Sequence, residues 1–121
     1  MVGSVFVYGT LMPGGPLWPA MEPYAASWRP AAAAGRMWDT GRGYPAVRFL
    51  AAGNLVPGVL VDIIPGLLAE ATFALDRIEE EGVLYRRVEI VTSAGPAMAY
   101  EWLGPTDAMA PLTGGWPKAG P

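Results

Sequence analysis

Apolar residues occur along the chain in short segments that glycine and proline interrupt. The segments SVFVYGTL (residues 4–11) and LVPGVLVDII (residues 55–64) are rich in valine, isoleucine and leucine, which is typical of β-strands. Two shorter strands, joined by a Gly-rich turn, are expected at residues 33–38 and 46–49. Proline and glycine flank the alanine run in the first of them and disfavour a helix there. Residues 12–28 are expected to form a loop with no more than a short helical turn.

One segment, residues 65–82, has the period of an amphipathic helix. Its sequence, PGLLAEATFALDRIEEEG, opens with Pro65 and Gly66 and closes with Gly82, as helix boundary signals predict. A spacing of three and four residues places a set of apolar side chains on one face, namely Leu67, Ala71, Ala74, Leu75 and Ile78. This apolar stripe is the face that we expect to be buried.

Two further strands are expected after the helix. Residues 84–93, LYRRVEIVTS, alternate in the manner of a strand, and residues 97–104, AMAYEWLG, form the last one. The alternation places Arg86 and Arg87 on opposite faces. Either one arginine faces inward, where it needs a carboxylate or several carbonyl groups, or both lie exposed on the strand. Residues 105–121 are rich in turn-forming residues and are expected to form a tail.

Composition supports a fold made of many short elements. The 121 residues include 16 glycines and 13 prolines, which favours turns and short strands over a helical bundle. Several strands with one helix late in the chain predict an α+β domain whose mixed sheet curls into a small β-barrel. The length fits a single domain, residues 1–121. The five tryptophans either line a cavity or fill the core, and their size favours the core.

The charge of the chain argues against two classes of partner. The net charge is −3, and Arg86 and Arg87 form the only basic cluster. Nucleic acids and anionic membranes both require several cationic contacts, so we expect neither as a partner. No apolar run reaches the roughly 18 residues of a membrane span, and the start of the chain lacks the pattern of a secretory signal. We expect a soluble, cytoplasmic protein, whose oligomeric state the sequence leaves open.

The chain contains neither cysteine nor histidine, which restricts its chemistry. Disulfides, thiolate nucleophiles, zinc fingers and the pairing of serine or cysteine with histidine are all excluded. A general acid or base would have to be Asp, Glu, Tyr or Lys, and the only lysine, Lys118, lies in the turn-rich tail. The search for a catalytic group therefore concentrates on the carboxylates.

Three consecutive glutamates, Glu79, Glu80 and Glu81, form the acidic end of the expected helix. At about 100° per residue, Glu80 points away from the apolar stripe, whereas Glu79 and Glu81 lie near its two edges. Glu81 precedes Gly82, where the helix frays, and can pair with Arg77. A carboxylate held against apolar neighbours has a raised pKa, which suits a general base. Periodicity places Glu79 slightly ahead of Glu81, and a fully solvated helix end is the alternative.

Four segments, taken together, carry a resemblance to a known family. FVYGTL (residues 6–11) comes first, AGRMWDTGRGYPAV (residues 34–47) second, LDRIE followed by YRR (residues 75–87) third, and PLTGGW (residues 111–116) last. They resemble the opening signature, the Gly-turn segment, the Leu-Asp-x-x-Glu and Tyr-x-Arg signature, and the C-terminal segment of the γ-glutamylcyclotransferase-like family, which includes AIG2-like proteins. The segments follow the family's order over nearly the whole chain.

The resemblance implies a mixed β-barrel with flanking helices and a cavity at one end. It implies that Glu79 is the general base, and it implies further site residues: Tyr8, Gly9, Thr10 and Leu11 as a substrate-binding loop, with Tyr85 and Arg87 in a supporting role. The sequence departs from the family in one respect at this site. The family usually has glycine directly after its glutamate, and here Glu80 and Glu81 come before Gly82.

The family reaction is the cyclisation of a γ-glutamyl amine or peptide to 5-oxoproline with release of the free amine. The nucleophile is the substrate's own α-amine, so no metal or cofactor is expected, in keeping with a chain that lacks Cys and His. Backbone N–H groups of Gly9, Thr10 and Leu11 are candidates for binding the substrate's α-carboxylate or an oxyanion, and Gly9 would permit close approach.

Two alternatives to an enzyme remain at this point. One is a small-molecule-binding or stress-linked module of the same fold that has lost turnover, and the other is a structural barrel without a site. The sequence does not specify the amine or peptide that carries the γ-glutamyl group.

Overall fold

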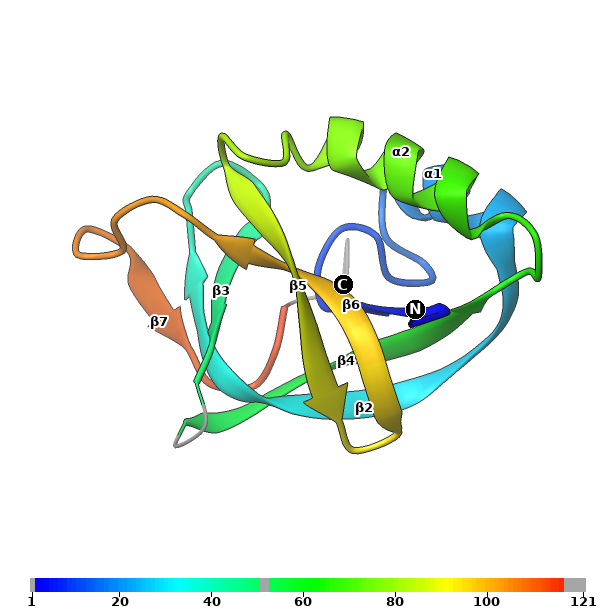
Figure 1. The fold of residues 1–121 in the computed structure, drawn as a ribbon. Helices are drawn as coiled ribbons and strands as arrows, with labels where there is room; N and C mark the ends of the chain where they lie inside the picture. The colour runs from blue at the N-terminus through cyan, green and yellow to red at the C-terminus, as the bar shows by residue number, and fades with distance from the viewer. Residues whose placement is uncertain (1, 51–52, 117–121) are drawn as a thin grey trace.

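The computed structural model describes residues 2–50 and 53–116, which form a mixed seven-stranded sheet nearly closed into a barrel, with helices on one side (Figure 1). The strands follow the order β3-β2-β4-β1-β6-β5, and β7 pairs with β2 off this path. The elements are β1 (Ser4–Val7), α1 (Trp18–Met21), the 3₁₀ turn η1 (Glu22–Tyr24), β2 (Ala25–Asp39), β3 (Pro45–Phe49), β4 (Asn54–Ile63), α2 (Leu68–Ile78), β5 (Tyr85–Thr92), β6 (Gly95–Trp102) and β7 (Ala110–Leu112). The expected α+β class with a mixed, barrel-like sheet is confirmed.

Strand β1 lies in the middle of the sheet and is buried on both faces. It pairs antiparallel with β4 and parallel with β6, where Val5 lies beside Met98. Val5 and Val7 belong to the core beneath the helices, whereas Phe6 belongs to the core inside the barrel. The strand ends earlier than the sequence pattern suggests, because a turn begins at Gly9, whose carbonyl accepts a hydrogen bond from the N–H of Met12.

Strand β2 is much longer than expected. It begins at Ala25, within the expected loop, and its pairing with β4 runs from Ala25 opposite Ile63 to Gly35 opposite Asn54. The early half has little strand signal of its own, but β4 supplies a full row of backbone partners. Pairing with a strong neighbouring strand therefore outweighs the local preference for a loop.

The expected tail also contains a strand. Ala110–Leu112 forms β7 and pairs with the last three residues of β2, from Met37 to Asp39. This pairing corrects the expectation that residues 105–121 form only a turn-rich tail. The end of that segment, residues 117–121, lies outside the described residues.

Contacts between the two ends of the strand order draw the sheet towards closure. The N–H of Phe49 on β3 donates a hydrogen bond of 2.9 Å to the Glu101 carboxylate on β6. The N–H of Ser93, which follows β5, donates one of 2.8 Å to the carbonyl of Ala32 on β2. Both contacts join strands that are not neighbours in the sheet order, so the sheet encloses an interior.

Helix α2 packs on the outside of the sheet through the stripe that the sequence predicts. Ala71 and Leu75 are fully buried, in the same core as Val5 and Val61. The tryptophans are divided: Trp18 and Trp102 are buried, whereas Trp28 is 47% exposed. No helix among residues 2–50 and 53–116 has the length and apolar character needed to cross a membrane.

The three glutamates follow the helix instead of belonging to it, because α2 ends at Ile78. Glu79 is the C-cap residue, and the next residue, Glu80, has a φ of 50°, in the left-handed region. The N–H of Glu81 bonds to the carbonyl of Asp76, and the N–H of Glu80 bonds to that of Arg77. This pair of bonds is a Schellman motif, which usually places glycine at the position of Glu80.

Candidate active site

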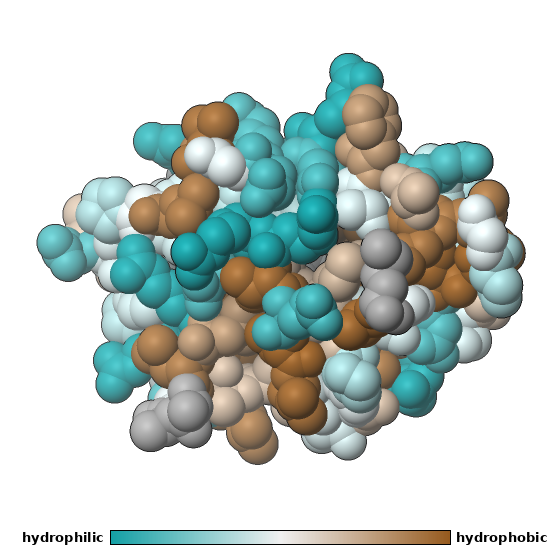
Figure 2. All heavy atoms as spheres, viewed as in Figure 1, coloured by the Kyte–Doolittle hydropathy of each residue, from teal (hydrophilic) through white to brown (hydrophobic). Residues whose placement is uncertain are grey.

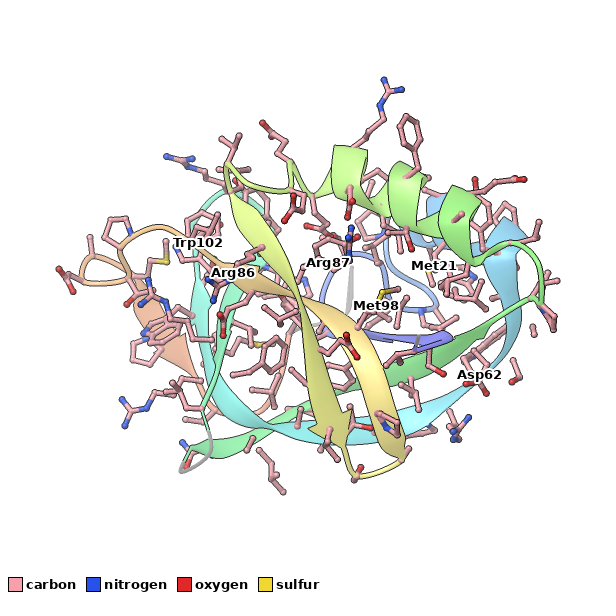
Figure 3. The ribbon with its side chains drawn as sticks, viewed as in Figure 1. Met21, Asp62, Arg86, Arg87, Met98 and Trp102 are labelled. Carbon is pink, nitrogen blue, oxygen red and sulfur yellow. The ribbon has the colours of Figure 1, made fainter. Side chains whose placement is uncertain are left out.

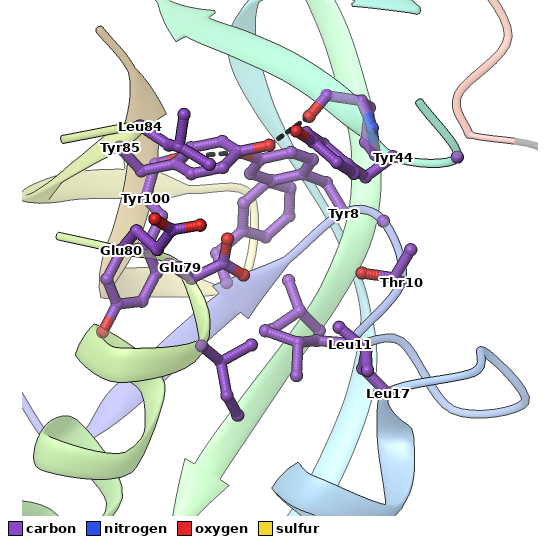
Figure 4. Close-up of a pocket in the computed structure, with 16 residues that line it drawn as sticks. Tyr8, Thr10, Leu11, Leu17, Tyr44, Glu79, Glu80, Leu84, Tyr85 and Tyr100 are labelled. Carbon is purple, nitrogen blue, oxygen red and sulfur yellow. Dashed lines mark hydrogen bonds between the residues drawn. The ribbon is translucent and has the colours of Figure 1, made fainter. Parts of the chain in front are cut away.

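A cavity of about 340 Å³ lies between the C-terminal end of α2, the loop that follows β1, and the tyrosine side chains beside them (Figure 4). Segments far apart in the sequence meet there, because β1 pairs with both β4 and β6 while α2 covers them. The residues that line it are Phe6, Val7, Tyr8, Gly9, Thr10, Leu11, Leu17, Gly43, Tyr44, Pro45, Ile78, Glu79, Glu80, Leu84, Tyr85 and Tyr100.

Glu79 contributes a carboxylate to this cavity. The Schellman motif fixes its backbone at the helix end, and Figure 4 shows its side chain directed into the cavity, towards the ring of Tyr8 and the loop beyond. Burial raises the pKa of Glu79 from 4.5 to about 7, because the apolar surroundings disfavour the charged form. A carboxyl group with a pKa near neutrality can both accept and return a proton at physiological pH.

The loop of residues 8–11 forms the wall opposite Glu79. Its first residue, Tyr8, is buried, and its hydroxyl donates a hydrogen bond of 2.6 Å to the carbonyl of Tyr100. Among the backbone hydrogen bonds between described residues, none has the N–H of Gly9, Thr10 or Leu11 as donor. These three donors are therefore candidates to bind an anionic group of a ligand in the cavity.

Gly9 has a packing requirement that the sequence pattern does not reveal. A Cβ atom at this position would lie 2.7 Å from Cγ of Pro45, which is closer than carbon atoms can approach. Glycine here lets the loop after β1 lie directly against the start of β3. The loop and the Tyr44–Pro45 wall of the cavity are thus held at a fixed separation.

Tyrosine side chains make up much of the remaining wall. The hydroxyl of Tyr85 donates a hydrogen bond of 2.6 Å to the carbonyl of Pro45. Burial is the largest cause that raises the pKa of Tyr8, Tyr85 and Tyr100, and the Glu79 charge raises all three further. These phenols stay neutral at physiological pH, where they donate hydrogen bonds and do not act as bases.

Arg87 lies outside the cavity lining. Its guanidinium pairs with the carboxylate of Asp76 on α2, and Figure 3 shows it reaching beneath the end of this helix. Asp76 also accepts a hydrogen bond of 2.7 Å from the hydroxyl of Tyr100, which does line the cavity. Arg87 therefore contacts the site only through other side chains.

Both arginines of the pair are exposed, which decides between the two interpretations of Arg86 and Arg87. Arg86 pairs with Glu101 on the neighbouring strand at 3.0 Å, on the opposite side from Arg87. Figure 2 shows hydrophilic residues gathered over the end of α2 and the start of β5, where these charges lie. The expectation that Glu81 pairs with Arg77 is replaced by another contact, since its carboxylate accepts a hydrogen bond of 3.4 Å from the N–H of Arg87.

Two tyrosines of the cavity wall, Tyr44 and Tyr100, were not among the expected site residues. Tyr44 could have been predicted as a site residue, because it belongs to the Gly-turn segment that precedes β3. Tyr100 had no such signal, because it lies in an ordinary strand. No cluster of three or more potential metal-binding carboxylates occurs in the described parts of the chain.

Solved structures with this fold come from several kingdoms. An AIG2-like protein from Mus musculus matches with a TM-score of 0.76 at 18% identity, over 98% of this chain and 90% of that one. An Arabidopsis thaliana protein known from its solution structure has a TM-score of 0.63 at 25% identity, over 87% and 71% of the two chains. An uncharacterized protein from Pyrococcus horikoshii has a TM-score of 0.63 at 19% identity, over 93% and 86%. These similarities establish the fold.

Comparison of the sequence with known proteins identifies a family but no individual relative. No curated protein matches the chain. The family model described as "Gamma-glutamyl cyclotransferase, AIG2-like" matches residues 5–118, which is almost the whole sequence.

Proposed function

The chain belongs to the AIG2-like γ-glutamyl cyclotransferase family, and on this basis we propose that it cyclises a γ-glutamyl amine or peptide to 5-oxoproline and releases the free amine. The observation that carries the proposal is the position of Glu79. Its carboxyl group has a pKa of about 7 and lies in a cavity opposite the backbone donors of residues 9–11. This reaction requires a base and, across the same cavity, a group of anion-binding donors.

The reaction needs a base that transfers two protons. The α-nitrogen of the substrate attacks the γ-carbonyl carbon, so one C–N bond forms in the ring while the γ-amide C–N bond breaks. The α-ammonium group gives up two protons in total, and the leaving nitrogen gains two to depart as an ammonium ion. Glu79 accepts each proton from the α-nitrogen and passes it to the leaving nitrogen, which its near-neutral pKa favours.

In this proposal the loop after β1 binds the anionic groups of the substrate. The N–H groups of Gly9, Thr10 and Leu11 bind the α-carboxylate and the oxyanion that forms on the γ-carbonyl oxygen. Pre-positioned donors of this kind stabilise charge where it develops and also fold the substrate so that amine and carbonyl meet. The neutral phenols of Tyr8 and Tyr85 form part of the cavity wall.

Tyr85 and Arg87 take supporting roles in this proposal. Tyr85 holds Pro45 in the cavity wall through its hydroxyl group. Arg87 neutralises Asp76, which in turn bonds to Tyr100 and precedes Glu79 by one turn of helix. No metal or cofactor enters the proposed reaction, because the substrate supplies its own nucleophile.

The proposed function is tested by incubating the protein with γ-glutamyl amides and measuring 5-oxoproline. Glu79→Gln should lower kcat/KM by at least about 100-fold, in line with the loss of a general base. Glu81→Gln is the matched control, because Glu81 is exposed and does not line the cavity. Full activity of Glu79→Gln would remove the assignment. Absence of product with the unaltered protein would favour the alternative, a binding module of the same fold.

A further inference from the structure

A second and larger cavity, of about 580 Å³, adjoins the first. The two share three lining residues, Gly9, Thr10 and Gly43. Figure 4 shows Thr10 across the first cavity from Glu79. The two cavities therefore meet at this loop, one on the side of Glu79 and the other beyond Thr10.

The second cavity has a different chemical character from the first. Its described lining includes Trp28, Trp116, Met12 and Val59, and it includes no charged side chain. Thr10 is the one polar side chain of that lining. Such a surface favours an apolar ligand group, and its described residues offer no cation to pair with a carboxylate and no carboxylate to pair with an ammonium group.

Trp28 is the side chain most suited to recognition. It is 47% exposed although it is large and apolar, and its ring packs edge-on against that of the buried Trp18 with centroids 4.9 Å apart. Trp18 thus supports the exposed ring on one side. An accessible indole ring is a stacking surface for another aromatic ring.

We propose that the second cavity binds the amine half of the substrate, and that the preferred substrates are γ-glutamyl amides of apolar, aromatic amines. The inference rests on the proposed function. The γ-glutamyl half lies in the first cavity, where Glu79 and the loop donors are, and the scissile amide lies near Thr10. Ring closure then leaves 5-oxoproline beside Glu79 and the aromatic amine against Trp28.

Three substrates that differ in the amine half test this inference: γ-glutamyl 2-phenylethylamide, γ-glutamyl methylamide and γ-glutamyl-ε-lysine. We expect kcat/KM for the aromatic amide to exceed that of the other two by about tenfold or more. Trp28→Ala should reduce the ratio of aromatic amide to methylamide at least fivefold, and Trp28→Phe, which keeps a ring, should reduce it less. Phe73→Ala is the matched control, because Phe73 is an exposed aromatic residue on α2 that lines neither cavity.

The outcomes separate this inference from the proposed function. Equal rates for all three substrates, a preference for γ-glutamyl-ε-lysine, or an unchanged ratio in Trp28→Ala would each overturn the inference while the proposed function stands. Absence of turnover with every substrate would overturn the proposed function. In that case the second cavity is still tested by calorimetry. The measurement compares the affinity of the aromatic amide for the Glu79→Gln protein with its affinity for the Glu79→Gln, Trp28→Ala double variant. Equal affinity in the two proteins would refute it, and at least fivefold weaker binding without Trp28 would support it.

Discussion

The hydroxyl of Tyr100 donates a hydrogen bond of 2.7 Å to the carboxylate of Asp76, so strand β6 is tied to the last turn of α2. The same carboxylate pairs with Arg87 on β5. Three elements thus meet at one side chain that lies three residues before Glu79. The helix end that carries the proposed base is therefore joined to two strands by contacts that lie mostly outside the cavity.

The first prediction concerns this junction. Tyr100→Phe and Asp76→Asn should each lower the free energy of unfolding by about 1 kcal/mol. The first leaves the Asp76 carboxylate without the hydroxyl donor, and the second removes the charge that strengthens this bond and pairs with Arg87. The double variant should lose less than the sum, which a double-mutant cycle in urea measures. Tyr24→Phe is a suitable control, since no hydrogen bond from the Tyr24 hydroxyl occurs between described residues. Strict additivity in the cycle would show that the two side chains act independently.

A second prediction follows for the pH dependence of activity. The proposed base is protonated below its pKa of about 7 and cannot then accept the proton from the α-ammonium group. The value of kcat/KM should therefore rise about tenfold per pH unit below 7 and level off above it, as long as the substrate amine titrates higher. The measurement is 5-oxoproline formation between pH 5 and 9. An acid limb centred near 4.5 would assign the base to an exposed carboxylate.

Stability should change in the opposite direction over part of this range. The pKa of Glu79 is raised by folding, so the folded protein binds more protons than the unfolded chain between about pH 4.5 and 7. The contribution of Glu79 is fully present below pH 4.5 and is lost as the pH rises through 7. The loss amounts to at most about 3 kcal/mol. Urea unfolding of the unaltered protein and of Glu79→Gln should diverge across this window and run parallel above it. Parallel curves throughout would contradict the raised pKa.

A fourth prediction concerns Glu80, which occupies the left-handed position of the Schellman motif with a φ of 50°. Left-handed backbone costs a residue with a side chain roughly 1 kcal/mol, whereas glycine adopts it freely. Glu80→Gly should therefore raise the free energy of unfolding by up to about 1 kcal/mol. Glu80→Ala keeps a Cβ and should give no comparable gain. If alanine and glycine stabilise equally, charge repulsion among the glutamates, and not the backbone, is the cause.

The fold could be predicted where a segment carries its own signal. The Val- and Leu-rich segments became β1 and β4, and the apolar stripe of α2 packs as its period predicts, with Ala71 and Leu75 fully buried. The early half of β2 and all of β7 were missed, because their backbone partners lie far away in the sequence. No local pattern encodes the row of hydrogen bonds that a distant strand provides.

The candidate site could be predicted only in part, for a similar reason. Periodicity placed Glu79 at the edge of the buried stripe, and the structure has its carboxylate in the cavity. The left-handed turn at Glu80, however, comes from the bonding of the helix end, which the acidic run does not reveal. The need for glycine at position 9 likewise arises because the sheet brings the loop after β1 into close contact with Pro45. The catalytic role of Glu79 stays a prediction until the variants are assayed.

The central position of β1 also has a consequence for how the molecule forms. Its two neighbours, β4 and β6, lie about 50 and 90 residues further along the chain. A polypeptide emerging from the ribosome therefore carries an apolar strand whose first partner, β4, is complete only at residue 63 and whose second, β6, only at residue 102. Folding should be slow for a protein of this size, since such distant pairings must close large loops before they are stabilised. Until then the strand is exposed to chaperones and to other nascent chains, and the cavity does not exist.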